Sequence, residues 1–186
     1  MQSHPRDSLS HLLQGVDANA PFRPRPVERW HPERCGDIGL EILADGTWRH
    51  EGTPILRPAL VALFASILRR DPDGFYLVTP AEKVVVAVAD APFVILTADR
   101  EGEGPLQVVR LCTNVGEEFA LDAAHPLRVA VDPAMQATRP YVLVRPGLEA
   151  LIARSVYYDL AAWGAPGPDG LGFGVWSGGA WLALET

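Results

Sequence analysis

The chain has 186 residues, 48% of them apolar and 21% charged, with a formal net charge of −7. This composition fits a globular protein of one domain or two small ones, and the acidic excess argues against a protein that coats nucleic acid. Without a signal core or an apolar run of about 18 residues, a cytoplasmic location is expected, and two cysteines and dispersed histidines indicate neither a metal site nor a cofactor.

The first 34 residues are the least regular part of the sequence. Residues 7–14, DSLSHLLQ, are compatible with one or two helical turns. Four prolines then exclude regular helix over PFRPRPVERWHPER, residues 21–34. We expect an extended strap there, held to the body of the protein by Val27 and Trp30.

Regular elements are predicted from Asp37 onward. Alternating apolar residues before Asp45–Gly46 predict a hairpin. Pro58 suits the first position of a helix, because its missing N–H needs no partner there. The apolar face of that helix recurs at spacings of three and four, at Leu60, Leu63, Phe64, Ile67 and Leu68. Three strands are expected next, over 75–78, 84–88 and 93–97.

The polar segment 99–105, DREGEGP, is the best candidate for a domain boundary. Hairpins are expected after it, over 107–121 and 127–144. A helix is then expected from Pro146, and a closing hairpin over 172–184. The predicted domains are a short helix and Pro-rich strap over 1–34, a first half over 35–100 and a second half over 101–186.

The two helical segments repeat one another. ILRPALVALFASIL (55–68) and LVRPGLEALIARSV (143–156) are identical at six of fourteen positions, including an Arg-Pro pair in the same register. Each is followed by an Asp-Gly and a strand pair. We therefore predict an α+β fold of two related halves, each a mostly antiparallel sheet or open barrel with one amphipathic helix, preceded by the strap.

A series of motifs in fixed order resembles a known bacterial family. These are DGTWRHEGTPILR, LVTPAEKV, DAPF, the TNVG turn, RPYVLVRPGLEALIAR and GVWSGG. From Cys35 to the C-terminus they are similar to domain-of-unknown-function family 1285. The resemblance implies two related halves, the second loosely like a pleckstrin-homology barrel. It supplies no activity, but it implies a signalling role with a nucleotide-like ligand held between the halves.

Arginine placement is the main lead to function. Arg57 and Arg145 stand at the expected helix N-termini, where free N–H groups and the helix dipole favour an anion. A guanidinium adds donors suited to phosphate or carboxylate. Alternatively, each arginine pairs with an acid of its own half, such as Glu51 or Glu149. Trp48 either offers a stacking face to a ligand or belongs to the core.

Five further residues complete the candidate set. Glu82 and Lys83 follow a Thr79–Pro80 turn, and either cap that turn or face a ligand. Asn114 is a turn residue by default. Arg154 and Tyr157 are one helical turn apart, on a solvated face or at a contact between the halves. Neither a phosphate loop nor a nucleophile elbow is present, so no catalytic residue is assigned.

These observations predict a binding module for a small anionic ligand, with the nucleotide-like character supplied by the family resemblance. A protein-interaction or scaffold module with a protein partner is the first alternative. An enzyme with dispersed catalytic residues is the second.

Overall fold

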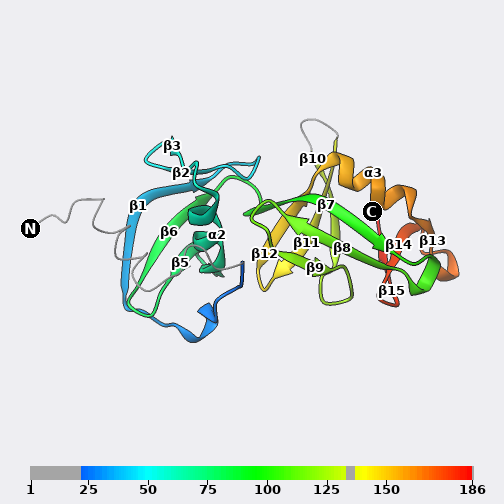
Figure 1. Ribbon diagram of the computed structural model, residues 1–186, viewed down its shortest axis with the longest axis horizontal. Helices are drawn as coiled ribbons and strands as arrows, with labels where there is room; N and C mark the ends of the chain where they lie inside the picture. Colours follow the sequence, from blue (N-terminus) through cyan, green and yellow to red (C-terminus); the bar gives the residue numbers. More distant parts are fainter. Residues whose placement is uncertain (1–21, 133–136, 186) are drawn as a thin grey trace, which may run out of the picture. The chain divides into compact units, whose positions relative to one another are not determined.

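The computed structural model describes residues 22–132 and 137–185 (Figure 1). The helical turns expected over 7–14 lie outside this part. The chain divides into two compact units between Pro92 and Phe93, and each unit is described by itself. The polar segment 99–105, expected to be the boundary, instead forms the end of one strand and its connection to the next.

The first unit is a six-stranded mixed sheet with one helix. Its order is β3-β2-β1-β6-β5-β4, with β1 and β6 parallel in the middle and all other neighbours antiparallel. The two antiparallel meanders are joined by helix α2 (Pro58–Ser66). The strands are β1 (Arg34–Ile42), β2 (Trp48–His50), β3 (Thr53–Pro54), β4 (Leu68–Asp71), β5 (Gly74–Val78) and β6 (Glu82–Val88).

Helix α2 begins at Pro58, as predicted, and covers the core face of this sheet. The Trp48 ring lies 6.0 Å from the ring of Phe64 on the helix, and both side chains are fully buried. The helix is shorter than expected, because it ends at Ser66, whose hydroxyl donates to the Leu63 carbonyl at 2.7 Å. Leu68, predicted to lie on the helix, is the first residue of β4.

The Pro-rich strap runs beside β4. It contains a short 3-10 turn, Val27–Arg29, and the Arg25 N–H donates to the Ser66 carbonyl at 2.9 Å. Val27 is buried and Trp30 is half-buried. The strap is therefore held to the first unit, as its apolar residues predict.

The second unit repeats the same sheet. Its order is β10-β11-β12-β7-β8-β9, again with one parallel pair, β7 and β12, in the middle. Helix α3 (Arg154–Ala162) and a three-stranded sheet complete it (Figure 1). The strands are β7 (Phe93–Glu101), β8 (Val108–Thr113), β9 (Glu118–Ala120), β10 (Leu127–Asp132), β11 (Ala137–Arg145), β12 (Leu148–Ile152), β13 (Ala165–Pro166), β14 (Phe173–Ser177) and β15 (Ala180–Ala183).

The two units share a strand order when their strands are counted from one to six. In each, two three-stranded meanders are joined so that the first strand lies beside the last, in parallel. The helix sits at different points of the chain, between the meanders in the first unit and after the second meander in the second. The chain thus contains two related α+β units, as expected, although the sequence repeat that suggested them does not align equivalent elements.

The repeat proposed between 55–68 and 143–156 is wrong, because Pro58 starts a helix and Pro146 does not. Arg145 pairs with Leu148 across a two-residue turn, and Gly147 has a φ of 72°. Positive φ after a proline is the geometry of a tight turn, which glycine adopts without strain. The residues that follow form strand β12, and the helix begins only at Arg154.

The β14–β15 hairpin docks on β8 through buried polar contacts. The Ser177 hydroxyl, fully buried, accepts the Val109 N–H at 2.9 Å. The Gln107 side-chain amide donates to the Trp176 carbonyl at 2.7 Å. The closing hairpin predicted from the sequence is therefore an integral part of the second unit. Over residues 22–132 and 137–185, no helix is long and apolar enough to cross a membrane.

Candidate functional site

Arg57 occupies the N-cap position of α2 and its side chain is exposed. The guanidinium of Arg57 makes no hydrogen bond or ion pair with the residues that the structure describes. Glu51, one expected partner, is exposed in the turn between β2 and β3 and forms no ion pair with Arg57. The N-cap makes no side-chain hydrogen bond to the helix, and the first turn holds no acidic residue. The described residues of this unit, 22–92, thus do not neutralise the positive end of the helix dipole or the guanidinium.

Arg145 has the opposite environment. Its Nε lies 3.2 Å from Oε2 of Glu117, with the two side chains 13% and 9% exposed. Its guanidinium carbon is 5.3 Å from the centroid of the Phe93 ring. The expected partner Glu149 instead forms two hydrogen bonds with Arg128. Arg145 therefore has the structural role that the sequence left open as the alternative.

Burial dominates the electrostatics of the Arg145–Glu117 pair. It raises the pKa of the Glu117 carboxyl, although Arg145 and His125 both favour the carboxylate. It also lowers the pKa of Arg145, against the attraction of Glu117. Both shifts disfavour the charged forms, which is what desolvation of a buried ion pair produces.

Arg154 lies at the N-terminus of α3, the helix of the second unit. It is the first residue of α3, it is exposed, and the first turn of the helix contains no acidic residue. Its Nε donates to the Tyr158 hydroxyl at 3.0 Å, and its guanidinium carbon lies 5.6 Å from that ring. Arg154, not Arg145, is therefore the residue of the second unit that stands at a helix N-terminus, as Arg57 does in the first.

Trp48 is a core residue. Its side chain is 1% exposed and packs on Phe64, so it has no free face for a ligand. Asn114 and Tyr157 also hold the structure together. The Asn114 side chain accepts the Val94 N–H at 3.0 Å, and its own N–H donates to the Val94 carbonyl at 2.8 Å. The Tyr157 hydroxyl donates to the Leu184 carbonyl, and burial raises its pKa.

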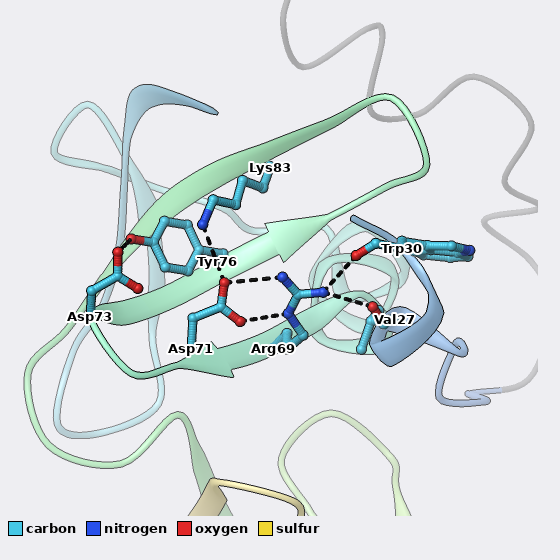
Figure 2. Close-up of polar contacts among 7 residues, drawn as sticks. All are labelled: Val27, Trp30, Arg69, Asp71, Asp73, Tyr76 and Lys83. Atoms are coloured by element: carbon cyan, nitrogen blue, oxygen red, sulfur yellow. Dashed lines mark hydrogen bonds and ion pairs between the residues drawn. The ribbon is translucent and has the colours of Figure 1, made fainter. Parts of the chain in front are cut away.

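Lys83 belongs to a polar network on the first sheet, centred on Arg69 and Asp71 (Figure 2). The Lys83 ammonium contacts the Asp71 carboxylate at 3.3 Å and lies 4.1 Å from the centroid of the Tyr76 ring. The Tyr76 hydroxyl donates in turn to Asp73 at 2.9 Å. Contact with Asp71 raises the pKa of Lys83, so its charge is already matched within the sheet.

Arg69 holds the strap, and sequence reasoning missed it. Its Nε and Nη2 donate to the two oxygens of Asp71 at 2.6 and 3.0 Å. Its Nη1 donates to the carbonyls of Val27 and Trp30, each at 2.8 Å (Figure 2). These bonds keep the pKa of Asp71 below its usual value. Nothing in the local sequence around Arg69 indicates that its side chain bonds to carbonyls of the strap.

Glu82 begins β6 beside this network. Its carboxylate lies 3.7 Å from the Arg34 guanidinium on the adjacent strand. The Thr79 hydroxyl accepts the Glu82 N–H at 3.1 Å and donates to the Glu82 carbonyl at 3.0 Å. The Thr79 hydroxyl therefore caps this turn as expected, but the Glu82 side chain does not, because the Thr79 N–H donates to the Glu82 backbone carbonyl at 2.9 Å. Within the described residues, no group of three or more His, Cys, Asp or Glu is placed to hold a metal ion.

The candidates thus separate into two kinds. Arg57 and Arg154 are exposed at helix N-termini, one in each unit. The others are paired or buried within their own unit, which leaves the two helix N-termini as the candidate anion sites. Arg57 is the stronger of the two, because Arg154 already contacts Tyr158.

Comparisons with known proteins agree with this architecture. Residues 25–91 match the family model "Domain of unknown function (DUF1285), N-terminal domain", and residues 92–184 match "Protein of unknown function (DUF1285), C-terminal domain". The boundary between the two family models, after residue 91, lies one residue before the boundary between the two units, after Pro92. No curated protein matches the chain.

Two crystal structures are similar to this one. A DUF1285 family protein from Silicibacter pomeroyi DSS-3 is 44% identical, over 100% of this chain and 97% of that chain, with a TM-score of 0.86. Another, from Shewanella baltica OS155, is 29% identical, over 65% of this chain and 88% of that chain, with a TM-score of 0.52. Sequence, fold and relatives therefore agree that this chain is a member of the DUF1285 family.

Proposed function

We propose that the protein is a binding and signalling module for a small anionic ligand, which contacts Arg57 at the N-terminus of α2. The observation that carries the proposal is the exposed Arg57 guanidinium, which has no partner among the described residues. Arg145, by contrast, is paired with Glu117. Arg57 therefore has the binding capacity that Arg145 lacks.

The helix N-terminus supports an anion there. The Leu60 and Val61 N–H groups bond back to the Arg57 carbonyl, at 3.0 and 3.1 Å, and Pro58 has no N–H. The Ala59 N–H and the helix dipole remain to act with the guanidinium. A phosphate or carboxylate group has the geometry for a two-pronged bond with arginine. Nucleotides are the first probes, because the family resemblance implies a nucleotide-like ligand.

Thermal shift with a panel of nucleotides, and with inorganic phosphate alone, tests this proposal. A ligand at 100 times its Kd adds about 2.7 kcal/mol to stability, so binding gives a measurable rise in Tm. Arg57→Ala should weaken binding by about 1.5–3 kcal/mol, the range for hydrogen bonds to a charged group, while Arg57→Lys keeps part of it. Arg110→Ala, which removes an exposed arginine of β8, is the matched control.

Two results would overturn the proposal. One is the absence of a shift with every probe. The other is an affinity that Arg57→Ala leaves at the wild-type value, because the anion would then be bound elsewhere.

A protein-interaction module is the second candidate, favoured by two exposed apolar side chains of the second unit. Leu96 on β7 is 54% exposed and Tyr158 on α3 is 57% exposed. Helix α3 packs beside β7. In this proposal the second unit, loosely pleckstrin-homology-like, docks a peptide over these side chains. Leu96→Asp with Tyr158→Asp should abolish capture of the partner while leaving anion binding at Arg57 intact.

A further inference from the structure

Four ionisable side chains of alternating charge form a row within the second unit: Arg145, Glu117, His125 and Asp122. At one end, the Arg145 Nε lies 3.2 Å from Oε2 of Glu117. At the other end, the His125 Nδ1 lies 2.9 Å from Oδ1 of Asp122. The four residues belong to three segments: the β8–β9 turn, the end of β11, and residues 121–126, which connect β9 to β10. The row therefore joins these segments through their charges.

The β8–β9 hairpin brings the two middle members of the row together. The Thr113 N–H donates to the Glu117 carbonyl at 2.9 Å, which continues the register in which Leu111 pairs with Phe119. Glu117 and Phe119 are two residues apart along this strand, so their side chains point to the same side of the hairpin. The His125 ring lies against the Phe119 ring, with 4.7 Å between the centroids. His125 is thus on the side of the hairpin that carries the Glu117 carboxyl.

The two ends of the row keep fixed charges. Burial lowers the pKa of Arg145, but an arginine stays protonated in proteins. The hydrogen bond from His125 lowers the pKa of Asp122, which is therefore a carboxylate and an acceptor. His125 Nδ1 is then the donor, and its Nε2 is the atom that takes up a further proton. The charged residues next to the row in sequence are exposed or paired with each other: Glu118, Arg128 and Glu149.

One proton on the middle pair makes the row neutral, whether Glu117 or His125 carries it. Without that proton, two carboxylates face one guanidinium, and with a second proton the row is positive. A net charge in a partly buried cluster is unfavourable. We propose that Glu117 and His125 hold one proton in common, and that this proton keeps residues 121–126 against the β8–β9 turn. The second unit then contains a pH-sensitive contact that is independent of anion binding at Arg57.

The wild-type protein tests the shared proton without any substitution. Carboxyl carbon shifts of Glu117 and ring resonances of His125 are followed by NMR across the pH range. Coupled groups titrate in macroscopic steps that belong to the pair, so the Glu117 curve should contain a step at the pH where His125 titrates. A Glu117 curve with no change at the His125 midpoint would refute the proposal.

Glu117→Gln removes the charge of the carboxylate and keeps its size. The titration midpoint of His125 should then fall by about one pH unit, the lower end of the effect of an opposite charge close by. Glu118→Gln is the matched control, because it removes the same charge from an exposed side chain on the other side of the hairpin. It should leave the midpoint nearly unchanged, with His31 of the strap as the internal reference. Equal shifts in the two variants would rule out a direct coupling.

Hydrogen–deuterium exchange tests the contact that the proton maintains. The Ala124 and His125 N–H groups donate to the Asp122 carboxylate at 2.8 and 3.2 Å. After correction for the intrinsic effect of pH, their exchange in wild type should accelerate as the pH rises through the His125 midpoint. In Glu117→Gln the same loss of a proton leaves the row neutral, so the acceleration should disappear. Equal acceleration in both proteins would show that the proton does not hold residues 121–126.

Discussion

Arg145 and Glu117 form an ion pair at 3.2 Å in which neither side chain is more than 13% exposed. Glu117 lies in the turn before β9, and Arg145 ends β11. The Glu117 N–H also donates to the Thr113 hydroxyl at 3.0 Å, which fixes the turn. The pair therefore joins two hairpins of the second unit that are distant in the sequence.

Arg145→Ala should lower the free energy of unfolding by about 3–5 kcal/mol, because it leaves the Glu117 carboxylate buried without a counter-ion. Urea unfolding measures this. Arg128→Ala is the control, since its pair with Glu149 is 52% and 35% exposed. An exposed pair contributes about 0.2–1 kcal/mol. Anion binding at Arg57 should be unchanged in both variants. Equal costs for Arg145→Ala and Arg128→Ala would contradict a buried pair.

Glu117 should give the stability a distinct pH dependence. Its pKa is raised in the folded protein above the ordinary 4.5, so the folded state holds this proton more tightly than the unfolded chain. Its contribution is therefore fully present below about pH 4.5 and is lost as pH rises towards the folded pKa. Glu117→Gln removes the titratable carboxyl group and with it this pH-dependent contribution.

The free energy of unfolding of the wild type, relative to that of Glu117→Gln, should therefore increase as the pH falls from the folded pKa of Glu117 towards about 4.5. Urea midpoints across the acid range give the difference directly. A difference that is flat with pH, or that moves the other way, would show that Glu117 has no raised pKa.

Arg69→Ala should release the strap, since one nitrogen of Arg69 holds both the Val27 and the Trp30 carbonyls. Trypsin cleavage after Arg29, within the strap, should then be faster while the sheet stays intact. Arg70→Ala is the matched control on the same strand: its guanidinium lies over the Phe75 ring, 4.4 Å from the centroid, and it also removes one trypsin site. Equal cleavage rates in the two variants would show that Arg69 does not hold the strap.

The hairpins of the fold could be predicted because short turns carry local signals. Asp45–Gly46 and Asn114–Gly116 each mark a reversal that the structure contains. The segment after Pro146 could not be assigned from spacing alone. Leu148, Ala150 and Ile152 alternate as in a strand, while Leu148, Leu151 and Ile152 also fit a helix face. Gly147 after the proline is the residue that decides, because it favours a turn over a helix start.

The candidate site was harder to predict, because burial depends on partners far away in the sequence. Arg57 and Arg145 look alike locally, each before a proline. Glu117, which neutralises Arg145, belongs to a different hairpin. The strap contact of Arg69 joins residues about forty positions apart. No local pattern reports such pairings, so the sequence predicted where arginines stand along the chain but not which of them are already satisfied.

The parallel pair in the middle of each sheet also constrains the order of folding. Arg34 of β1 pairs with Glu82 of β6, and Phe93 of β7 pairs with Ala150 of β12. The first strand of each unit can therefore pair with its parallel partner only after the last strand has been synthesised. Until then the chain can form only two separate meanders. Long-range closure of this kind is slow, and the unpaired edges of β1 and β7 are exposed meanwhile. Each unit should consequently fold after its synthesis is complete, and truncation before β6 or β12 should leave chains that aggregate.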